Sequence, residues 1–156
     1  MERFSLFIKE NIRLILGVAV VIFALLLLLT LLFSRKSTKV VVEGQTFSVI
    51  VAKTDKEKQI GLSETKKLDK NKGMLFVFDS ADYYAFWMKN MKFPIDIIYV
   101  NGNKVTTVIH QAQPTSLLNM PIYQPSEKSD KVLEINSGLS KTYNIKAGSV
   151  VKIQNL

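Results

Sequence analysis

The most apolar part of the chain is an unbroken run near its N-terminus. Residues 14–33 are twenty consecutive positions without a charged side chain. At 1.5 Å rise per residue, a helix of this length extends about 30 Å, the thickness of the hydrocarbon core of a bilayer. A helix buried in a small soluble domain would rarely be apolar on every face. The run therefore predicts one transmembrane helix that binds the lipid bilayer through residues 14–33, after a short N-terminal tail over residues 1–13.

The end of this run distinguishes an anchor from a cleaved signal peptide. The run is longer than the usual apolar region of a signal peptide, and it continues into Ser34-Arg35-Lys36 without a small-x-small pair for a signal peptidase. We therefore predict an uncleaved signal anchor and a single-pass membrane protein. Three basic residues precede the run and three follow it, so charge selects no orientation.

After a linker and first strand at residues 34–45, the pattern changes to short β-branched and aromatic runs. Such runs, separated by turn residues, are typical of strands. The Asn101-Gly102 pair predicts a hairpin turn, because both residues tolerate a positive φ. The predicted strands cover residues 40–42, 47–51, 74–78, 83–89, 95–100, 103–110, 131–136 and 149–154.

Two short helices are predicted between these strands. Thr54 and Glu57 have the spacing of a capping box, which begins a helix that Gly61 ends. Ser137 is predicted to cap a second helix over residues 138–143.

The predicted elements favour a mainly β fold. Strands and helices do not alternate, so a doubly wound parallel sheet is not expected. Residues 113–129 contain three prolines and no clear period, which indicates a long loop. We predict a compact antiparallel β-sandwich or barrel-like domain with two short helices over residues 46–156, preceded by the transmembrane helix.

Composition removes several classes of function. The chain has no Cys and one His, which excludes a disulfide scaffold, an iron–sulfur protein and a cysteine nucleophile and leaves few zinc ligands. We expect no metal site and no cofactor. Residues 1–39 carry a net charge of +4, half of the total of +8. This half lies where it can hold anionic lipid headgroups, and the mildly basic remainder predicts no nucleic-acid partner.

The segment Phe86–Ile98, FWMKNMKFPIDII, closely resembles the domain of unknown function 192 family. The supporting blocks occur in the family's order, at residues 61–62, 73–78, 132–138 and 143–148, so the resemblance covers residues 46–154. It implies a small β-rich domain, often behind a signal peptide or membrane anchor. On that basis we expect residues 34–156 on the extracytoplasmic side of the cell membrane. The chain lacks the Arg common before Gly-Leu-Met and the Cys that many members have in the long loop, so no role of either is transferred.

Strand alternation places charged residues on apolar faces. Asp96 shares a face with Ile98 and Val100, while Lys89 and Glu134 lie in apolar strands of their own. Such residues are seldom buried unless paired, so one interpretation is an ion pair of Lys89 with Asp96 or Glu134. The functional interpretation is a pocket lined by Trp87, Lys89, Asn90, Asp96 and Glu134.

Three hypotheses of function follow. The first is a non-catalytic binding or envelope-interaction module for a small ligand, a glycan or a protein segment. The alternative is a hydrolase-like enzyme that acts on a cell-envelope substrate through Asp96 and Glu134 as acid and base. A third is support of a membrane-protein partner. His110 could pair with an Asp and a Ser such as Ser116, but no nucleophile elbow is present, and a structural or solvent-facing His is favoured.

Overall fold

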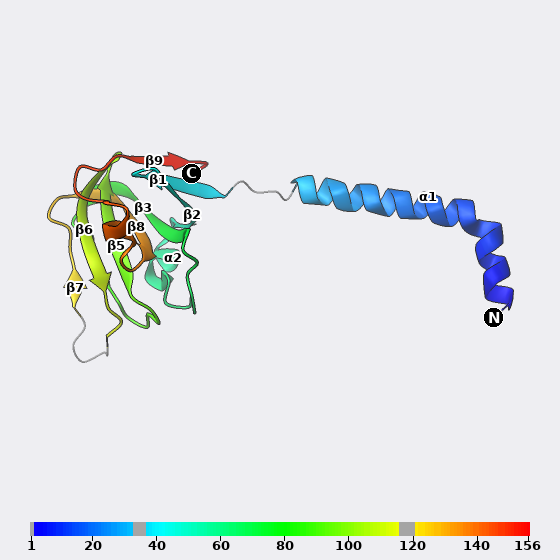
Figure 1. Ribbon diagram of the computed structural model, residues 1–156, viewed down its shortest axis with the longest axis horizontal. Helices are drawn as coiled ribbons and strands as arrows, with labels where there is room; N and C mark the ends of the chain where they lie inside the picture. Colours follow the sequence, from blue (N-terminus) through cyan, green and yellow to red (C-terminus); the bar gives the residue numbers. More distant parts are fainter. Residues whose placement is uncertain (1, 33–36, 116–120) are drawn as a thin grey trace. The chain divides into compact units, whose positions relative to one another are not determined.

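The computed structural model describes residues 2–32, 37–115 and 121–156 (Figure 1). The chain divides into two compact units, Met1–Lys36 and Ser37–Leu156. In the first unit, α1 (Glu2–Leu32) is a single helix. Its segment Asn11–Thr30 is long and apolar enough to cross a membrane, and none of the side chains in this segment is buried. The predicted apolar N-terminal helix is therefore confirmed; its last residue, Phe33, and linker residues 34–36 lie outside the described residues.

The second unit is mainly β, as predicted. Seven strands form one sheet in the order β6-β5-β8-β3-β2-β1-β9, and β4 pairs with β7 in a second, small sheet. The elements are β1 (Thr38–Val42), β2 (Gln45–Ala52), α2 (Asp55–Ile60), β3 (Lys72–Asp82), β4 (Phe86–Trp87), β5 (Ile95–Asn101), β6 (Lys104–Ala112), β7 (Ile122–Tyr123), β8 (Ser129–Asn136), α3 (Leu139–Thr142) and β9 (Val151–Gln154).

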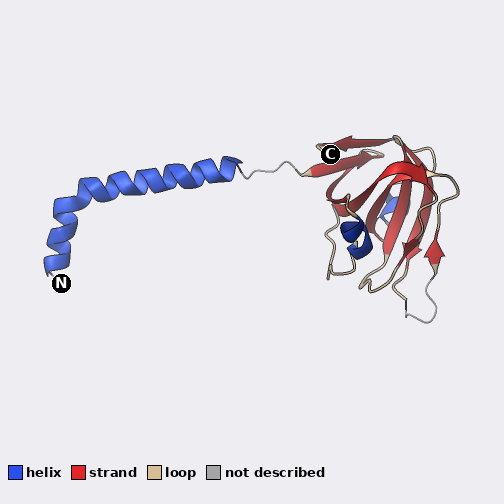
Figure 2. Cartoon of the chain, turned by 180° about the vertical axis from the view of Figure 1, so that it is seen from behind, coloured by secondary structure: helices blue, strands red, loops and turns tan. Residues whose placement is uncertain are grey.

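The large sheet curls into a half-barrel (Figure 2). Its two edge strands approach each other at one end, where an isolated bridge joins Lys104 to Val150. Backbone bonds extend this contact, with Val105 N donating to Ser149 O at 2.9 Å and Gly148 N donating to Val105 O at 2.8 Å. The curl gives the sheet an inner and an outer face.

One strand pairing differs from the antiparallel prediction. β2 and β3 are parallel, while the other pairs in the sheet are antiparallel. The connection between them contains α2 and is long enough to return the chain to the same end of the sheet, as a parallel pair requires. The capping box that begins α2 is confirmed: Glu57 N donates to Thr54 Oγ1, and Thr54 N donates to Glu57 Oε2.

Several local predictions are wrong. The turn expected at Asn101-Gly102 lies one residue later, at Gly102 and Asn103, because Asn101 pairs with Lys104 at the end of β5. The strand expected at residues 83–89 contracts to the two residues of β4, whose partner β7 lies inside the expected loop 113–129. Ser137 does not cap α3, because the N-cap is Gly138, which has a φ of 85° and makes no side-chain cap bond. Tertiary pairing, which local propensity does not contain, decided the length of β4.

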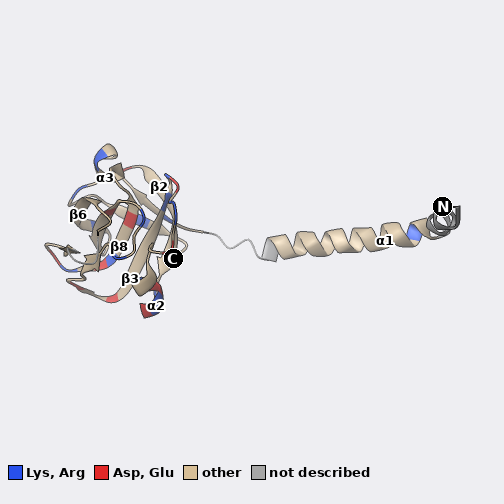
Figure 3. Ribbon diagram, turned by 90° about the horizontal axis from the view of Figure 1, so that it is seen from below, with Lys and Arg blue, Asp and Glu red and all other residues tan. Residues whose placement is uncertain are grey.

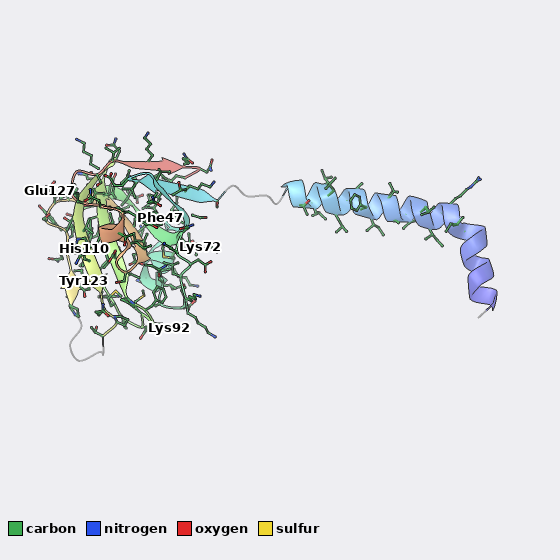
Figure 4. The ribbon with its side chains drawn as sticks, in the orientation of Figure 1. Phe47, Lys72, Lys92, His110, Tyr123 and Glu127 are labelled. Atoms are coloured by element: carbon green, nitrogen blue, oxygen red, sulfur yellow. The ribbon has the colours of Figure 1, made fainter. Side chains whose placement is uncertain are left out.

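Each face of the large sheet has its own hydrophobic core. The inner core takes residues from all seven strands, such as Phe47 (Figure 4), together with Leu139 of α3. The outer core is completed by connecting segments, which contribute Leu62, Leu68 and Met88. Figure 3 shows α3 and α2 on opposite sides of the strands. Two buried layers thus lie on one sheet, and the central strands β5 and β8 are buried on both sides.

Candidate functional site

The two buried carboxylates of the β domain lie on opposite faces of the large sheet. In the antiparallel register of β5 and β8, Ile97 lies opposite Glu134 and Asp96 lies opposite Ile135. Opposed residues share a face, and consecutive residues alternate between faces. Glu134 therefore lies on the outer face with Ile97, and Asp96 lies on the inner face with Ile135. The structure does not bring the two carboxylates together, so they cannot serve as acid and base on one bond.

Asp96 is fully buried and its carboxylate accepts three hydrogen bonds. Gln111 N donates to Oδ1 at 2.8 Å, and Ser140 donates to Oδ2 through its backbone N–H at 2.8 Å and its hydroxyl at 2.6 Å. Gln111 has a φ of 55° at an irregular position in the β5–β6 pairing. Asp96 therefore joins β5 to this irregularity and to the start of α3.

The same cluster includes the single histidine. His110 Nδ1 lies 2.7 Å from Ser140 Oγ. Because the Ser140 hydroxyl donates to Asp96, the bond is completed when His110 Nδ1–H donates to Ser140 Oγ. In a nucleophilic triad the imidazole lies between the hydroxyl and the carboxylate, whereas here the serine occupies the middle. The order fits the structural interpretation of His110, and Ser116 lies outside the described residues.

The predicted ion pair of Lys89 with a buried carboxylate is absent from residues 37–115 and 121–156. The ion pairs in those segments join Lys72 to Asp69, Lys128 to Asp82 and Lys131 to Asp130. Asp96 needs no cation, because three donors already satisfy it. Lys89 is exposed and lies on the other side of the sheet, beside Glu134.

A pocket of about 340 Å³ lies on the outer face. This volume is at the lower end of the range for small-molecule sites. Its walls come from α2 and the turn after it, from β3, from residues 84–91, and from Glu134 of β8. Five aromatic side chains dominate these walls: Phe76, Phe78, Tyr84, Phe86 and Trp87.

The aromatic walls are mutually packed. Phe78 and Tyr84 are stacked with ring centroids 3.6 Å apart, and Phe76 meets Phe86 edge to face at 4.9 Å. The Lys58 Nζ atom lies over the Phe78 ring, 4.7 Å from its centroid. Trp87 keeps 53% of its surface exposed. The pocket therefore has preformed aromatic walls and one indole at its open side.

Glu134 is the buried ionisable group of this pocket. Its side chain is 5% exposed, and Oε2 has no hydrogen-bond partner in the described part of the chain. Burial raises the pKa of Glu134 to about 8, so the carboxyl group is largely protonated at neutral pH. The pKa of nearby Tyr99 is also raised, first by burial and then by the charge of Glu134. Oε2 is thus a buried polar atom without a protein partner, of the kind a ligand can satisfy.

Two glycines shape the surroundings of Glu134. Gly61 has a φ of 51°, and a Cβ there would lie 3.4 Å from Cζ of Phe76. A Cβ on Gly73 would lie 2.6 Å from the backbone oxygen of Glu134. Only glycine lets β3 approach β8 this closely, which holds the aromatic wall against the carboxyl group.

Three of the five sequence-predicted site residues, Trp87, Lys89 and Glu134, line this pocket, and Asn90 and Asp96 do not. Asn90 has a φ of 59° in the turn closed by Met91 N donating to Met88 O. The sequence analysis missed the aromatic residues of β3 and Lys58 of α2. The alternation of Phe76 and Phe78 in one strand was the available signal for the former.

A metal site does not emerge from residues 2–32, 37–115 and 121–156, where no three His, Cys, Asp or Glu side chains are grouped to hold an ion. Ser63, the serine of the pocket wall, donates its hydroxyl hydrogen to Ile60 O at 2.6 Å, and no His, Asp or Glu side chain of the described residues forms a hydrogen bond with it. The described lining therefore offers binding groups, and it does not offer an activated serine.

Comparison with known proteins gives a family and a fold. Residues 38–153 match the family model for domain of unknown function 192, described as "Uncharacterized ACR, COG1430". A protein of unknown function from Novosphingobium aromaticivorans is 31% identical, with a TM-score of 0.68 over 73% of this chain and 83% of that chain. A "putative transcription regulator" from Sinorhizobium meliloti is 26% identical, with a TM-score of 0.70 over 79% and 98%. No curated protein matches the chain.

Proposed function

The chain belongs to the domain of unknown function 192 family, a family of unknown function, and we propose that its β domain is a non-catalytic module that binds a small ligand in the outer-face pocket. The observation that supports this proposal is a cavity of about 340 Å³ that is lined by five aromatic side chains and by the buried Glu134, whose Oε2 has no hydrogen-bond partner among the described residues. Structural residues seldom leave a buried oxygen unsatisfied, whereas binding sites expose such groups to their ligands.

A thermal-shift screen of the full chain in a non-ionic detergent tests this proposal. A ligand at 100 times its Kd stabilises the folded state by about 2.7 kcal/mol. Trp87→Ala should abolish the shift, because the indole forms the open side of the pocket. Ile122→Ala is the matched control, since Ile122 lies opposite Trp87 in the small sheet, is exposed and does not line the pocket. The proposal would be overturned if no compound stabilised the chain. It would also be overturned if the stabilising compounds gave the same shift with Trp87→Ala as with the wild type.

We further propose that α1 anchors this module in the cell membrane with the β domain on the extracytoplasmic side. The uncharged run and the absence of a cleavage pattern support an anchor, and the family resemblance supports the side. Protease treatment of intact cells should release the β domain. Protection of the domain until the cells are lysed would contradict this orientation and leave the pocket proposal unaffected.

A further inference from the structure

Resting on the proposed binding function, we propose that the pocket takes a small organic carboxylate: a ring compound whose anionic group pairs with Lys58 and Lys89 at the rim and whose inner end accepts a hydrogen bond from Glu134. This inference names the charge and the polarity of the ligand, which the binding proposal alone leaves open.

Within the described part of the chain, neither lysine of the pocket forms a close ion pair. Lys72, Lys128 and Lys131 each pair with an aspartate within 4.0 Å. Lys58 and Lys89 have no such partner among the described residues, although both line the pocket. The Lys58 ammonium instead lies over the ring of Phe78. Neither ammonium group is held by a close carboxylate, so both can pair with a ligand anion.

Other ionisable groups share the pocket with Glu134. Asp55, Lys58, Tyr84 and Lys89 line it. Tyr99 packs edge to face against Phe86 of the pocket wall, and its hydroxyl donates to Tyr123 O at 2.9 Å. With Glu134 protonated, the pocket carries two positive charges and the one negative charge of Asp55. An anionic ligand balances this excess. A cationic ligand would face both lysines and would also require Glu134 to lose its proton.

The O–H group of protonated Glu134 is a hydrogen-bond donor at the inner end of the pocket. A protonated carboxyl group has one O–H that needs an acceptor, and Oε2 of Glu134 has no partner in the described segments. Lys58 and Lys89 are less buried than Glu134, so the pocket is cationic toward solvent and donates a hydrogen bond at depth. A ring between two such ends would pack against Phe76, Phe86 and Trp87 in offset or edge-to-face geometry.

Three compounds of one shape and different charge test the inference: 3-(4-methoxyphenyl)propanoate, its amide and the corresponding propylamine. Their Kd values for the full chain in a non-ionic detergent are measured by calorimetry at pH 7. The carboxylate should bind at least tenfold more tightly than the amide, and the amine most weakly. Lys89→Gln should remove the advantage of the carboxylate over the amide. Lys92→Gln is the matched control, because Lys92 is exposed, outside the pocket, and directed away from the domain in Figure 4.

The dependence of the Kd on pH tests whether Glu134 is the hydrogen-bond donor. If Glu134 must be protonated, the Kd of the carboxylate should increase about tenfold between pH 7 and pH 9, since the binding-competent fraction falls by that factor. Glu134→Gln keeps an N–H donor at every pH and should remove the part of this increase that the titration of Glu134 causes, so the difference between wild type and variant isolates this group.

The outcomes separate the two proposals. Tightest binding of the amine, equal binding of all three compounds, or affinity that rises with pH would overturn the carboxylate inference and leave a binding pocket in place. If none of the three compounds binds, the carboxylate inference is wrong, and the broader ligand screen decides whether the proposed function survives.

Discussion

Two carboxylates buried in one sheet, a single register position apart, have opposite environments. Asp96 accepts three hydrogen bonds on the inner face, and Oε2 of Glu134 on the outer face has no partner within residues 37–115 and 121–156. Both side chains are at most 5% exposed, so burial does not distinguish them. The difference lies in what surrounds each group: backbone and hydroxyl donors at Asp96, and an aromatic cavity at Glu134. A buried carboxylate with all its donors in place stabilises the fold, whereas a buried carboxyl oxygen without a partner costs stability unless something else bonds to it.

The largest effect is expected from Asp96→Ala. The change leaves the N–H of Gln111 and both donors of Ser140 without an acceptor, and each buried unsatisfied group costs about 1–3 kcal/mol. We expect the free energy of unfolding to fall by about 4 kcal/mol in denaturant titrations of the full chain in detergent. Asp79→Ala is the control, because Asp79 is exposed and has no ion pair in the described segments. Equal stability of the two variants would remove the structural role assigned to Asp96.

Glu134→Gln is expected to increase the free energy of unfolding, whereas Asp96→Ala decreases it. Burial raises the pKa of Glu134 from 4.5 to about 8, so between these values the unfolded chain releases a proton that the folded chain keeps. The stability of the wild type therefore falls as pH rises from 4.5 to 8 and changes little from this group above 8. The variant lacks this loss and should be more stable by about 3 kcal/mol at pH 7, with no difference below pH 4.5. Unfolding curves that keep the same separation at every pH would contradict this assignment.

The smallest loss of stability is expected from a change at the start of α2, which forms one wall of the pocket. Thr54→Ala removes the hydroxyl that accepts a hydrogen bond from Glu57 N, and loss of such a cap costs about 1 kcal/mol. Thr65→Ala is the control, since no hydrogen bond of its hydroxyl is present in the described part of the chain. The melting temperature measures both. If the variants melt alike, α2 is held by its contacts with the sheet and the capping box contributes little.

Local signals explain the parts of the structure that the sequence predicted well. The apolar run over residues 14–33 needs only its length and composition to predict a helix. The capping box of Thr54 and Glu57 is made within four residues. The β5–β6 hairpin is also a local feature and has Gly102 in its turn, although the turn lies one residue later than predicted. Alternation along residues 95–100 correctly separated Ile97 and Tyr99 from Ile98 and Val100. Each of these features is complete within a short segment of the chain.

The site depended on contacts between distant segments. Trp87, Lys89 and Glu134 were selected because a charge or an indole stood in an apolar strand, and they meet at the pocket. Asp96 was selected by the same pattern and lies on the other face, because the β5–β8 register decides which strand positions share a side. Lys58 went unnoticed, since a lysine in a short polar helix gives no local sign of the aromatic wall that it covers.

The sequence by itself determined an apolar N-terminal helix, a mainly β domain, the capping box of α2, and membership in a family. The helix, the strands and the cap are specified by hydrophobic periodicity and short-range hydrogen bonds, which depend on residues close together in the sequence. Only the tertiary structure decided that β2 and β3 run parallel, that Ser140 donates to Asp96, and that Glu134 lines a cavity with Oε2 unpaired among the residues the structure describes. The physical reason is that a buried carboxyl group takes its pKa and its role from donors and rings brought to it by strand register and curl, and these residues lie far away in the chain.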